Sequence, residues 1–252
     1  MDALYIAAIG LEAQKEQLDA LANNLANVGT TAFKRQSVDF SAILDRTPKT
    51  SSSTPADATA TQANSLLRVD QTPGEVHATG RALDVAILGS GFLEVELANN
   101  KIGYSRGGSL QVNTDGMLSI ASGQALKSDI RVPTGASDVR ILADGSVTAT
   151  LQGDSAATVL GQIELAAFTN PESLQYRGDG VFTAPESAEP VRARPGEEGV
   201  GQLAVQSLEG SNVQMTNEMV SLMLMQRIYE LNSRVAQVAD EIMGMSNNMR
   251  RS

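Results

Sequence analysis

The two ends of the chain carry hydrophobic residues at helical spacing. Near the N-terminus the apolar positions alternate in steps of three and four residues, which is the pattern of a heptad repeat. The stripe comprises Leu4, Ala7, Leu11, Gln14, Leu18, Leu21, Leu25 and Val28, with Gln14 as its polar interruption. Gly29 followed by two threonines is typical of a helix end. The pattern therefore predicts an amphipathic helix that ends near residue 28.

A second and more regular stripe lies at the C-terminal end. It comprises Leu224, Ile228, Leu231, Val235, Val238, Ile242 and Met245. Ser211 and Asn212 are candidate N-caps, and Glu218 lies in the early turns, where a carboxylate is favourable. The helix is therefore predicted to begin after Asn212 and to run to about residue 248.

Two arrangements of these helices are open. Each could pack as an ordinary amphipathic helix on a globular core, or the two could pair with each other as a coiled coil. We favour the pairing, because the helices lie at opposite ends of the chain and strand-like sequence fills the region between them. In that arrangement Ile228, Leu231, Val235 and Val238 face the N-terminal helix around Leu11, Leu18, Leu21 and Leu25.

The middle of the chain has a different texture. Residues 45–65 are rich in Ser, Thr, Ala and Pro without apolar periodicity, and they predict an extended linker. From 66 to 207 short apolar runs alternate with turn signals, and Asp-Gly pairs at 115–116, 144–145 and 179–180 predict tight turns or hairpins. The expected fold is α+β. The helical core domain comprises 1–44, which hold the N-terminal helix and a turn, and 208–252, which hold the C-terminal helix, and the two helices pair as a coiled coil. A linker occupies 45–65, and 66–207 form a central all-β domain.

The composition limits the partners. The 252 residues carry a formal net charge of −10, which argues against nucleic acid because phosphate binding needs a basic patch. The absence of cysteine excludes disulfides and thiolate metal sites. No apolar run approaches the roughly 20 residues that span a bilayer, and the N-terminus lacks the basic start of a cleavable signal peptide. We therefore expect neither membrane insertion nor a cleaved signal.

Candidate chemical sites are sparse. His77 is the only histidine and lacks the partners of a zinc or Ser-His site, so we interpret it as a surface or turn residue. Gly89 and Gly91 precede a strand-like run, which predicts a turn or bulge and not a dinucleotide loop. Glu94 and Glu96 share one strand face, which we interpret as solvated. No catalytic, metal or cofactor site is predicted, and the chain is not expected to be an enzyme.

Three asparagines at the end of the first helix need an explanation, because asparagine is a poor helix former. Asn23 and Asn27 are four residues apart and share a face, and Asn24 lies beside them. One interpretation is helix capping and turn chemistry before Gly29. The other is a ladder of amides that hydrogen-bonds a neighbouring subunit. The residues alone favour neither.

The segment ANNLANVGTTAFKR, residues 22–35, resembles the signature of the flagellar rod and hook protein family. Gly29 replaces the Asn, Asp or Ser more usual in that family, and Ala32 replaces a glycine. The second departure concerns the turn geometry, because alanine tolerates positive φ poorly.

Further blocks follow in the family's order. Leu83–Ile87 with Gly89, Gly91 and Phe92 resembles the entry into the family's β domain, and Tyr104–Arg106, Val112-Asn113 and Asp115-Gly116 resemble the next block, in which Leu110 replaces a common Phe. The block at 208–235, LEGSNVQMTNEMVSLMLMQRIYELNSRV, is the most specific match. The length favours a rod protein over the larger hook protein. The C-terminal block favours the distal end of the rod, whereas the short segment between Leu44 and Leu83 is nearer the proximal type.

The resemblance implies a structural subunit of the flagellar basal-body rod that self-assembles into a hollow helical tube and transmits torque. The implied partners are further copies of the chain, other rod and hook proteins, the flagellar type III export apparatus and surrounding ring proteins. The implied location is the basal body, where the rod crosses the periplasm. The subunit-interface residues that it implies, together with the stripes, are Leu11, Leu18, Leu21, Asn23, Asn24, Leu25, Asn27, Phe33, Lys34, Gln226, Ile228, Tyr229, Leu231, Asn232, Val235, Val238 and Ile242.

Two other functional classes are kept beside this one. The chain could be a β-rich secreted binding module or adhesin with helical ends, or a hydrolase that uses acidic residues. A monomeric binding module would need its terminal helices docked on the rest of the chain, whereas a rod subunit would order them on assembly.

Overall fold

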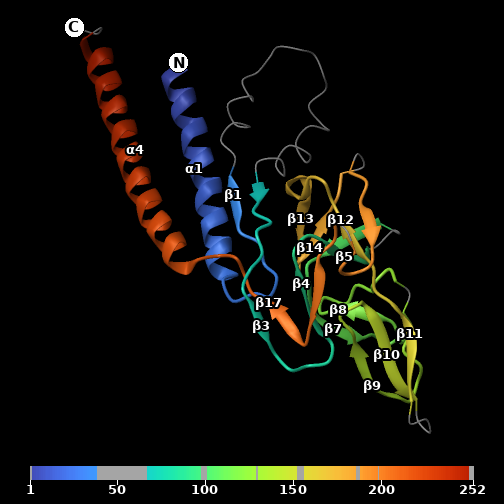
Figure 1. Cartoon of the computed structure of the whole chain (residues 1–252). Coiled ribbons are helices and arrows are strands. Elements are labelled where there is room, and N and C mark those ends of the chain that lie inside the picture. Colours follow the sequence, from blue (N-terminus) through green and yellow to red (C-terminus); the bar gives the residue numbers. More distant parts are fainter. Residues whose placement is uncertain are drawn as a thin grey trace. The chain divides into compact units, whose positions relative to one another are not determined.

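The heptad-spaced ends form the two long helices of the described chain, α1 (Asp2–Ala26) and α4 (Met215–Met249) (Figure 1). The computed structural model describes residues 2–38, 67–97, 101–128, 130–151, 156–185, 188–197 and 199–249, and for 2–11 and 235–249 it describes the backbone alone. The predicted linker at 45–65 lies outside these ranges. Helices at the two ends with a strand-rich region between them confirm the expected α+β class.

The chain divides into two compact units. The helical unit comprises Met1–Val28, Gln36–Arg68 and Val213–Ser252, and the β unit comprises Gly29–Arg35 and Val69–Asn212. Residues 29–35, which we call the strap, belong to the β unit, although the sequence assigned them to the helical core. In the helical unit α1 contacts both α4 and β1 (Gln36–Val38), and α1 and α4 run antiparallel.

The strand pairs of known register are antiparallel, both in hairpins such as β5-β6 and between distant segments such as β16-β4. Three sheets of six, four and three strands have the orders β13-β14-β6-β5-β12-β15, β16-β4-β7-β8 and β11-β10-β9, and the pairs β1-β2 and β17-β3 are separate. Their bounds are β2 Leu67–Val69, β3 Val76–Ala78, β4 Asp84–Leu88, β5 Phe92–Leu97, β6 Lys101–Ser105, β7 Gly107–Val112, β8 Leu118–Ile120, β9 Ala136–Ile141, β10 Ser146–Leu151, β11 Ala157–Gln162, β12 Leu165–Ala167, β13 Gln175–Gly178, β14 Val181–Thr183, β15 Val191–Ala193, β16 Gln202–Val205 and β17 Ser207–Glu209. A short 3-10 helix, η3, spans Pro171–Ser173.

All three Asp-Gly predictions are confirmed. Asp115-Gly116 joins β7 to β8, Asp144-Gly145 joins β9 to β10, and Asp179-Gly180 joins β13 to β14, each pair antiparallel. Each of these glycines has a positive φ, which a side chain would strain. Gly89 and Gly91 also have positive φ and form the turn between β4 and β5, which belong to different sheets.

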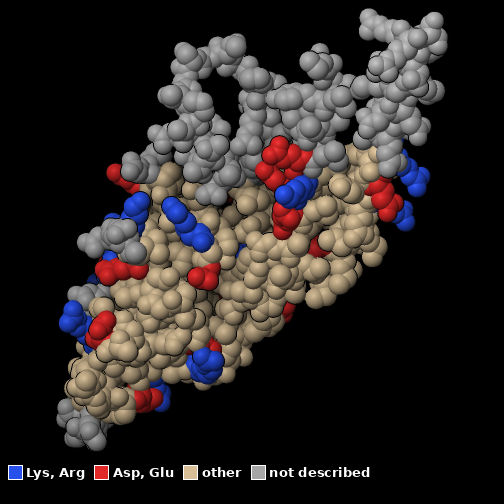
Figure 2. All heavy atoms as spheres, turned by 180° about the vertical axis from the view of Figure 1, so that it is seen from behind, with Lys and Arg blue, Asp and Glu red and all other residues tan. Residues whose placement is uncertain are grey.

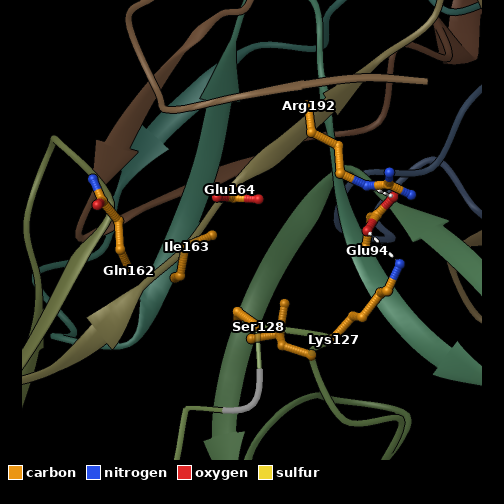
Figure 3. Close-up of a pocket in the computed structure, with 8 residues that line it drawn as sticks. Glu94, Lys127, Ser128, Gln162, Ile163, Glu164 and Arg192 are labelled. Atoms are coloured by element: carbon orange, nitrogen blue, oxygen red, sulfur yellow. Dashed lines mark hydrogen bonds and ion pairs between the residues drawn. The ribbon is translucent and has the colours of Figure 1, made fainter.

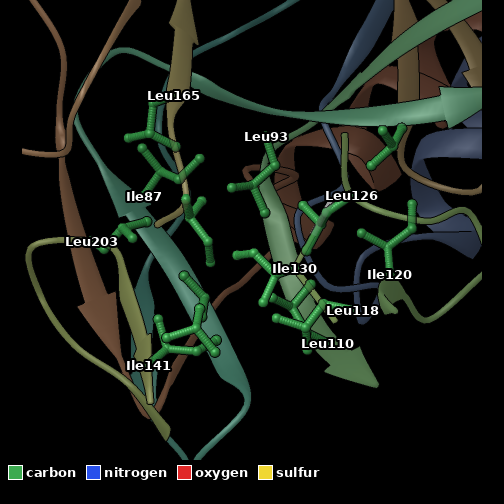
Figure 4. Close-up of a cluster of buried hydrophobic side chains, with 14 of the residues drawn as sticks. Ile87, Leu93, Leu110, Leu118, Ile120, Leu126, Ile130, Ile141, Leu165 and Leu203 are labelled. Carbon is green, nitrogen blue, oxygen red and sulfur yellow. The ribbon is translucent and has the colours of Figure 1, made fainter. Parts of the chain in front are cut away.

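The six-stranded sheet has a hydrophobic core on each face. Successive residues of a strand point to opposite faces, and Leu93, Leu165 and Val181 enter a large aliphatic cluster (Figure 4). Their chain neighbours Phe92, Ala166 and Phe182 enter a second cluster, rich in aromatic rings. The β unit is therefore closed by its own side chains on both sides of this sheet.

Candidate subunit interface

One face of α1 is buried within the chain. Ala13, Gln14, Ala20, Leu21 and Asn24 are buried there, and Leu18 and Leu25 are half-buried. Gln14 and Leu21 belong to the predicted stripe, whereas Ala13, Ala20 and Asn24 lie beside it, so the buried face is shifted from the predicted one. The side chain of Leu11 lies outside the described set.

The face that α4 buries is not its predicted apolar stripe. Glu218 and Met225, seven residues apart, are buried. Leu224, Ile228 and Leu231 keep 55%, 41% and 60% of their surface exposed. Ile228 and Leu231 were expected to face α1, and in the single chain they are exposed to solvent instead. A hydrogen bond from Asn24 Nδ2 of α1 to Glu218 Oε2, 3.4 Å long, joins the buried faces.

Many exposed residues of α4 are apolar, and Val220, Leu224, Ile228 and Leu231 recur at four- and three-residue steps. The large apolar residues that α4 exposes, among the described side chains, are Met215, Met219, Val220, Met223, Leu224, Ile228, Tyr229 and Leu231. We call this set the α4 face. Of the other predicted interface residues, Gln226 is exposed and Asn232 half-buried. Val235, Val238 and Ile242 lie on the helix with side chains outside the described set.

Asn24 is wholly buried and imitates a strand neighbour. Its side-chain Nδ2 donates to the carbonyl oxygen of Gln36 at 2.8 Å, and its Oδ1 accepts from the Gln36 backbone N–H at 2.8 Å. The end of α1 is thereby tied to β1. This bonding gives Asn24 a role inside the chain.

Asn23 and Asn27 bond to each other across one helical turn. Asn27 Nδ2 donates to Asn23 Oδ1 at 2.7 Å and to the Asn23 carbonyl at 2.9 Å, and Asn23 Nδ2 reaches Gln36 Oε1 at 3.3 Å. These contacts are those of the capping interpretation. Both side chains stay half-buried.

Phe33 and Lys34 are buried inside the β unit, at 1% exposure each. The Phe33 ring packs edge-on against Tyr176 with 6.0 Å between centroids, and Lys34 Nζ lies 2.5 Å from Glu209 Oε1. Burial lowers the pKa of the Lys34 ammonium from its ordinary value, and the Glu209 carboxylate opposes that shift. Both residues were expected at a subunit interface, but side chains this deeply buried act within their own chain.

Sequence reasoning missed three partners of these residues, namely Arg106, Glu209 and Asn212. Arg106 and Glu209 are charged yet buried. Both residues lie in sequence blocks that resemble the rod and hook family, and that position was the available signal. Burial itself could not be predicted from the sequence, because a charged residue is seldom fully buried unless it is paired. Asn212, expected as a helix cap, instead receives a hydrogen bond from the Arg35 N–H at 2.7 Å.

The other candidate sites show no arrangement for catalysis. His77 lies on β3 and is exposed. Glu94 Oε1 and Oε2 are occupied by Arg192 Nε at 2.9 Å and Lys127 Nζ at 3.2 Å, at the edge of a hollow of about 400 Å³ (Figure 3). Glu94 thus ties two neighbouring chain segments together, whereas Glu96 is exposed. Within the described ranges, no three His, Asp or Glu side chains gather closely enough to hold a metal ion.

The surface charges do not form a basic patch on the face drawn in Figure 2, where acidic and basic side chains are interspersed. None of the helices in the described part of the chain combines the length and hydropathy that crossing a bilayer demands.

Three family descriptions match successive parts of the chain. "Flagella basal body rod protein" matches residues 4–34, "Flagellar hook protein FlgE/F/G D1 domain" matches 86–149, and "Flagellar basal body rod FlgEFG protein C-terminal" matches 204–249. The first and third cover most of α1 and α4, and the second lies in the β unit.

Relatives match over nearly the whole length. The flagellar basal-body rod protein FlgG of Agrobacterium fabrum is 37% identical over 96% of this chain and 97% of its own. The FlgG protein of Caulobacter vibrioides is 33% identical over 99% of this chain and 100% of its own. The rod protein FlgF of Escherichia coli is also 33% identical, over 99% and 98%.

Proposed function

The chain belongs to the flagellar basal-body rod protein family, and on that premise we propose that neighbouring copies in the rod cover the α4 face. It is a structural subunit of the bacterial flagellar rod, from a family of structural proteins and not of enzymes. The observation that carries the proposal is the exposure of the α4 face, whose apolar side chains have no cover in the described single chain.

Covering one large apolar side chain contributes about 1.5–3 kcal/mol, so burying the α4 face against neighbouring copies favours assembly. When such contacts are heterologous, with a different surface on each partner, and their rotation does not close into a ring, they extend as a helical filament. The stripe Leu224, Ile228 and Leu231 then forms the coiled-coil seam in the assembled tube, continued by Val235, Val238 and Ile242.

The same proposal extends to the surroundings. The tube transmits torque and contacts other rod and hook proteins and the rings around it. Its subunits are exported through the flagellar type III apparatus, and the rod crosses the periplasm. The C-terminal block at 208–235 supports a place in the distal rod.

Leu231→Asp tests the proposal, since a charge in a buried seam would lack a partner. We expect the variant to be absent from isolated basal bodies and the cells to be non-motile, while the soluble monomer melts at the wild-type temperature. Val235→Asp, the next position of the stripe, is expected to behave in the same way.

Val159→Asp is the matched control, because Val159 is 63% exposed on β11 of the β unit. This variant should enter the rod and support motility. Normal motility with Leu231→Asp would show that the α4 face is not covered in the rod. Electron microscopy of basal bodies from a deletion strain should show a truncated or missing rod.

A further inference from the structure

The polypeptide passes between the two units four times, and the β-unit ends of all four passages lie on segments that bond to one another. The chain passes from one unit to the other at 28/29, 35/36, 68/69 and 212/213. The β-unit ends of these passages belong to three segments, namely the strap (29–35), an entry segment at 69–74 and an exit segment at 207–212. These segments are far apart in sequence, yet they bond directly to one another inside the β unit.

Backbone hydrogen bonds join the strap to both other segments. The Ala32 N–H donates to the Glu209 carbonyl at 2.8 Å, and the Asp70 N–H donates to the Arg35 carbonyl at 2.8 Å. Ala32 has a φ of +56°, in the left-handed region that favours glycine. The alanine therefore adopts the positive φ that was questioned from the sequence.

The Asn212 side chain bonds to the strap and the entry segment together. Its Oδ1 accepts from the Arg35 N–H at 2.7 Å, and its Nδ2 donates to the carbonyls of Asp70 at 2.9 Å and Thr72 at 3.1 Å. The amide of this exit-segment residue thus joins one residue of the strap to two residues of the entry segment.

Buried charges reinforce this junction. Lys34 Nζ of the strap donates to Glu209 Oε1 of the exit segment at 2.5 Å and to the Thr72 carbonyl of the entry segment at 2.8 Å. The Gly74 N–H donates to the same Glu209 oxygen at 2.9 Å. A Cβ on Gly74 would lie 2.0 Å from the Gly210 carbonyl oxygen, so the close approach of the segments needs glycine there.

Arg106 connects the junction to the body of the β unit. Its Nε lies 3.4 Å from Glu209 Oε2, and its Nη atoms donate to the carbonyls of Gly89, Gly91 and Ile87 at 2.9, 2.7 and 3.1 Å. Those carbonyls belong to β4 and the turn that leads into β5. Lys34, Glu209 and Arg106 therefore form a charged chain from the strap to the core sheets.

We propose that Lys34, Glu209 and Arg106 form a clasp that holds all four chain passages together and sets the force at which they detach from the β unit. The inference rests on the proposed role as a torque-bearing subunit. Force that is transmitted along the polypeptide from one unit to the other must enter the β unit through these segments. The clasp distributes that force among the three segments. Glu209 is the shared member of this cluster, because without its carboxylate the charges of Lys34 and Arg106 would be buried with no counter-charge.

Single-molecule force measurements on the full chain test the clasp. Because the chain contains no cysteine, two cysteines can be placed as handles. One lies in the β unit at Val159→Cys, and the other lies in the helical unit, either at Lys15→Cys on α1 or at Glu230→Cys on α4. All three positions are exposed. The two pairs of handles load the strap and the exit segment respectively.

Lys34→Met should shorten the lifetime of the attached state at constant force about a hundredfold with either pair of handles, because it removes the Nζ hydrogen bonds to Glu209 Oε1 and to the Thr72 carbonyl that join the strap to the other two segments. Asn212→Ala, which removes no charge, should shorten it less. Arg140→Met, which removes an exposed ion pair with Asp138, should match the wild type.

Hydrogen exchange of the unloaded chain separates a clasp from general stabilisation. In Lys34→Met the amides of Ala32, Arg35 and Asn212 should lose protection, while those of the core strands β4 and β5 keep it. An unchanged lifetime, or an effect confined to the strap handles, would overturn the proposal. Equal loss of protection in the core strands would also overturn it, and if Lys34→Met does not fold, Asn212→Ala carries the same comparison. None of these outcomes depends on rod assembly, so they are independent of the motility tests above.

Discussion

The β unit and the helical unit differ in how their apolar surface is covered. The β unit buries aliphatic and aromatic clusters on the two faces of its largest sheet and pairs the buried charges of Lys34, Glu209 and Arg106 with one another. The helical unit buries one face of α1 but leaves the α4 face exposed. The apolar surface of the β unit is therefore covered by residues of the same unit. The exposed apolar surface of the helical unit is the kind expected where a neighbouring copy binds.

Leu165→Ala should have the largest effect on the isolated chain. Leu165 is fully buried in the aliphatic cluster, and its truncation leaves a cavity that costs about 2–5 kcal/mol. Denaturant unfolding followed by the strand signal in circular dichroism measures this loss. Leu142→Ala, at a leucine 46% exposed, should change the free energy by no more than about 0.5 kcal/mol. Equal effects at the two leucines would contradict a closed β unit.

Asn24→Ala should have the next largest effect, and it should be confined to the helical unit. The change strips the buried N–H and carbonyl of Gln36 of their partner, at a cost of about 1–3 kcal/mol. Hydrogen exchange should report faster exchange at Gln36 and along the end of α1. Asn170→Ala, an exposed asparagine of the β unit, is the control. Slower strand refolding or lost protection in β5 would mean that the two units unfold together.

The double variant Asn23→Ala and Asn27→Ala should affect the monomer least. Each lost hydrogen bond is worth about 1 kcal/mol, and the bonds lie at the half-buried end of one helix. Motility then separates the two interpretations of these residues. Loss of rod assembly with an intact monomer would assign them to a ladder between subunits, and normal motility would leave them as helix caps.

Local signals predicted much of the fold. The Asp-Gly turns place three hairpins correctly because a hairpin turn is specified by its own residues. The heptad stripes place both helices, because periodicity is a property of one segment. Periodicity does not say which chain covers a stripe, however, and Leu224, Ile228 and Leu231 are exposed in the single chain.

The clasp was beyond such reasoning. Lys34 and Glu209 each look like an ordinary charged residue in their own segment, and 175 residues separate them. Only the folded β unit brings them together. The strap was assigned to the helical core for the same reason. It directly follows α1 in the sequence, whereas the segments that it contacts in the folded β unit are far away in the sequence.

That separation also sets an order of events as the protein is made. Lys34 leaves the ribosome early and has no partner until Glu209 follows it, so a growing chain holds an unpaired strap through most of its synthesis. Closing a loop of this length has an entropic cost that rises only slowly with chain length, but the closure must wait for the last residue involved. A nascent chain that stops before residue 209 therefore cannot form the junction. The β unit can close only after nearly the whole polypeptide has been synthesised.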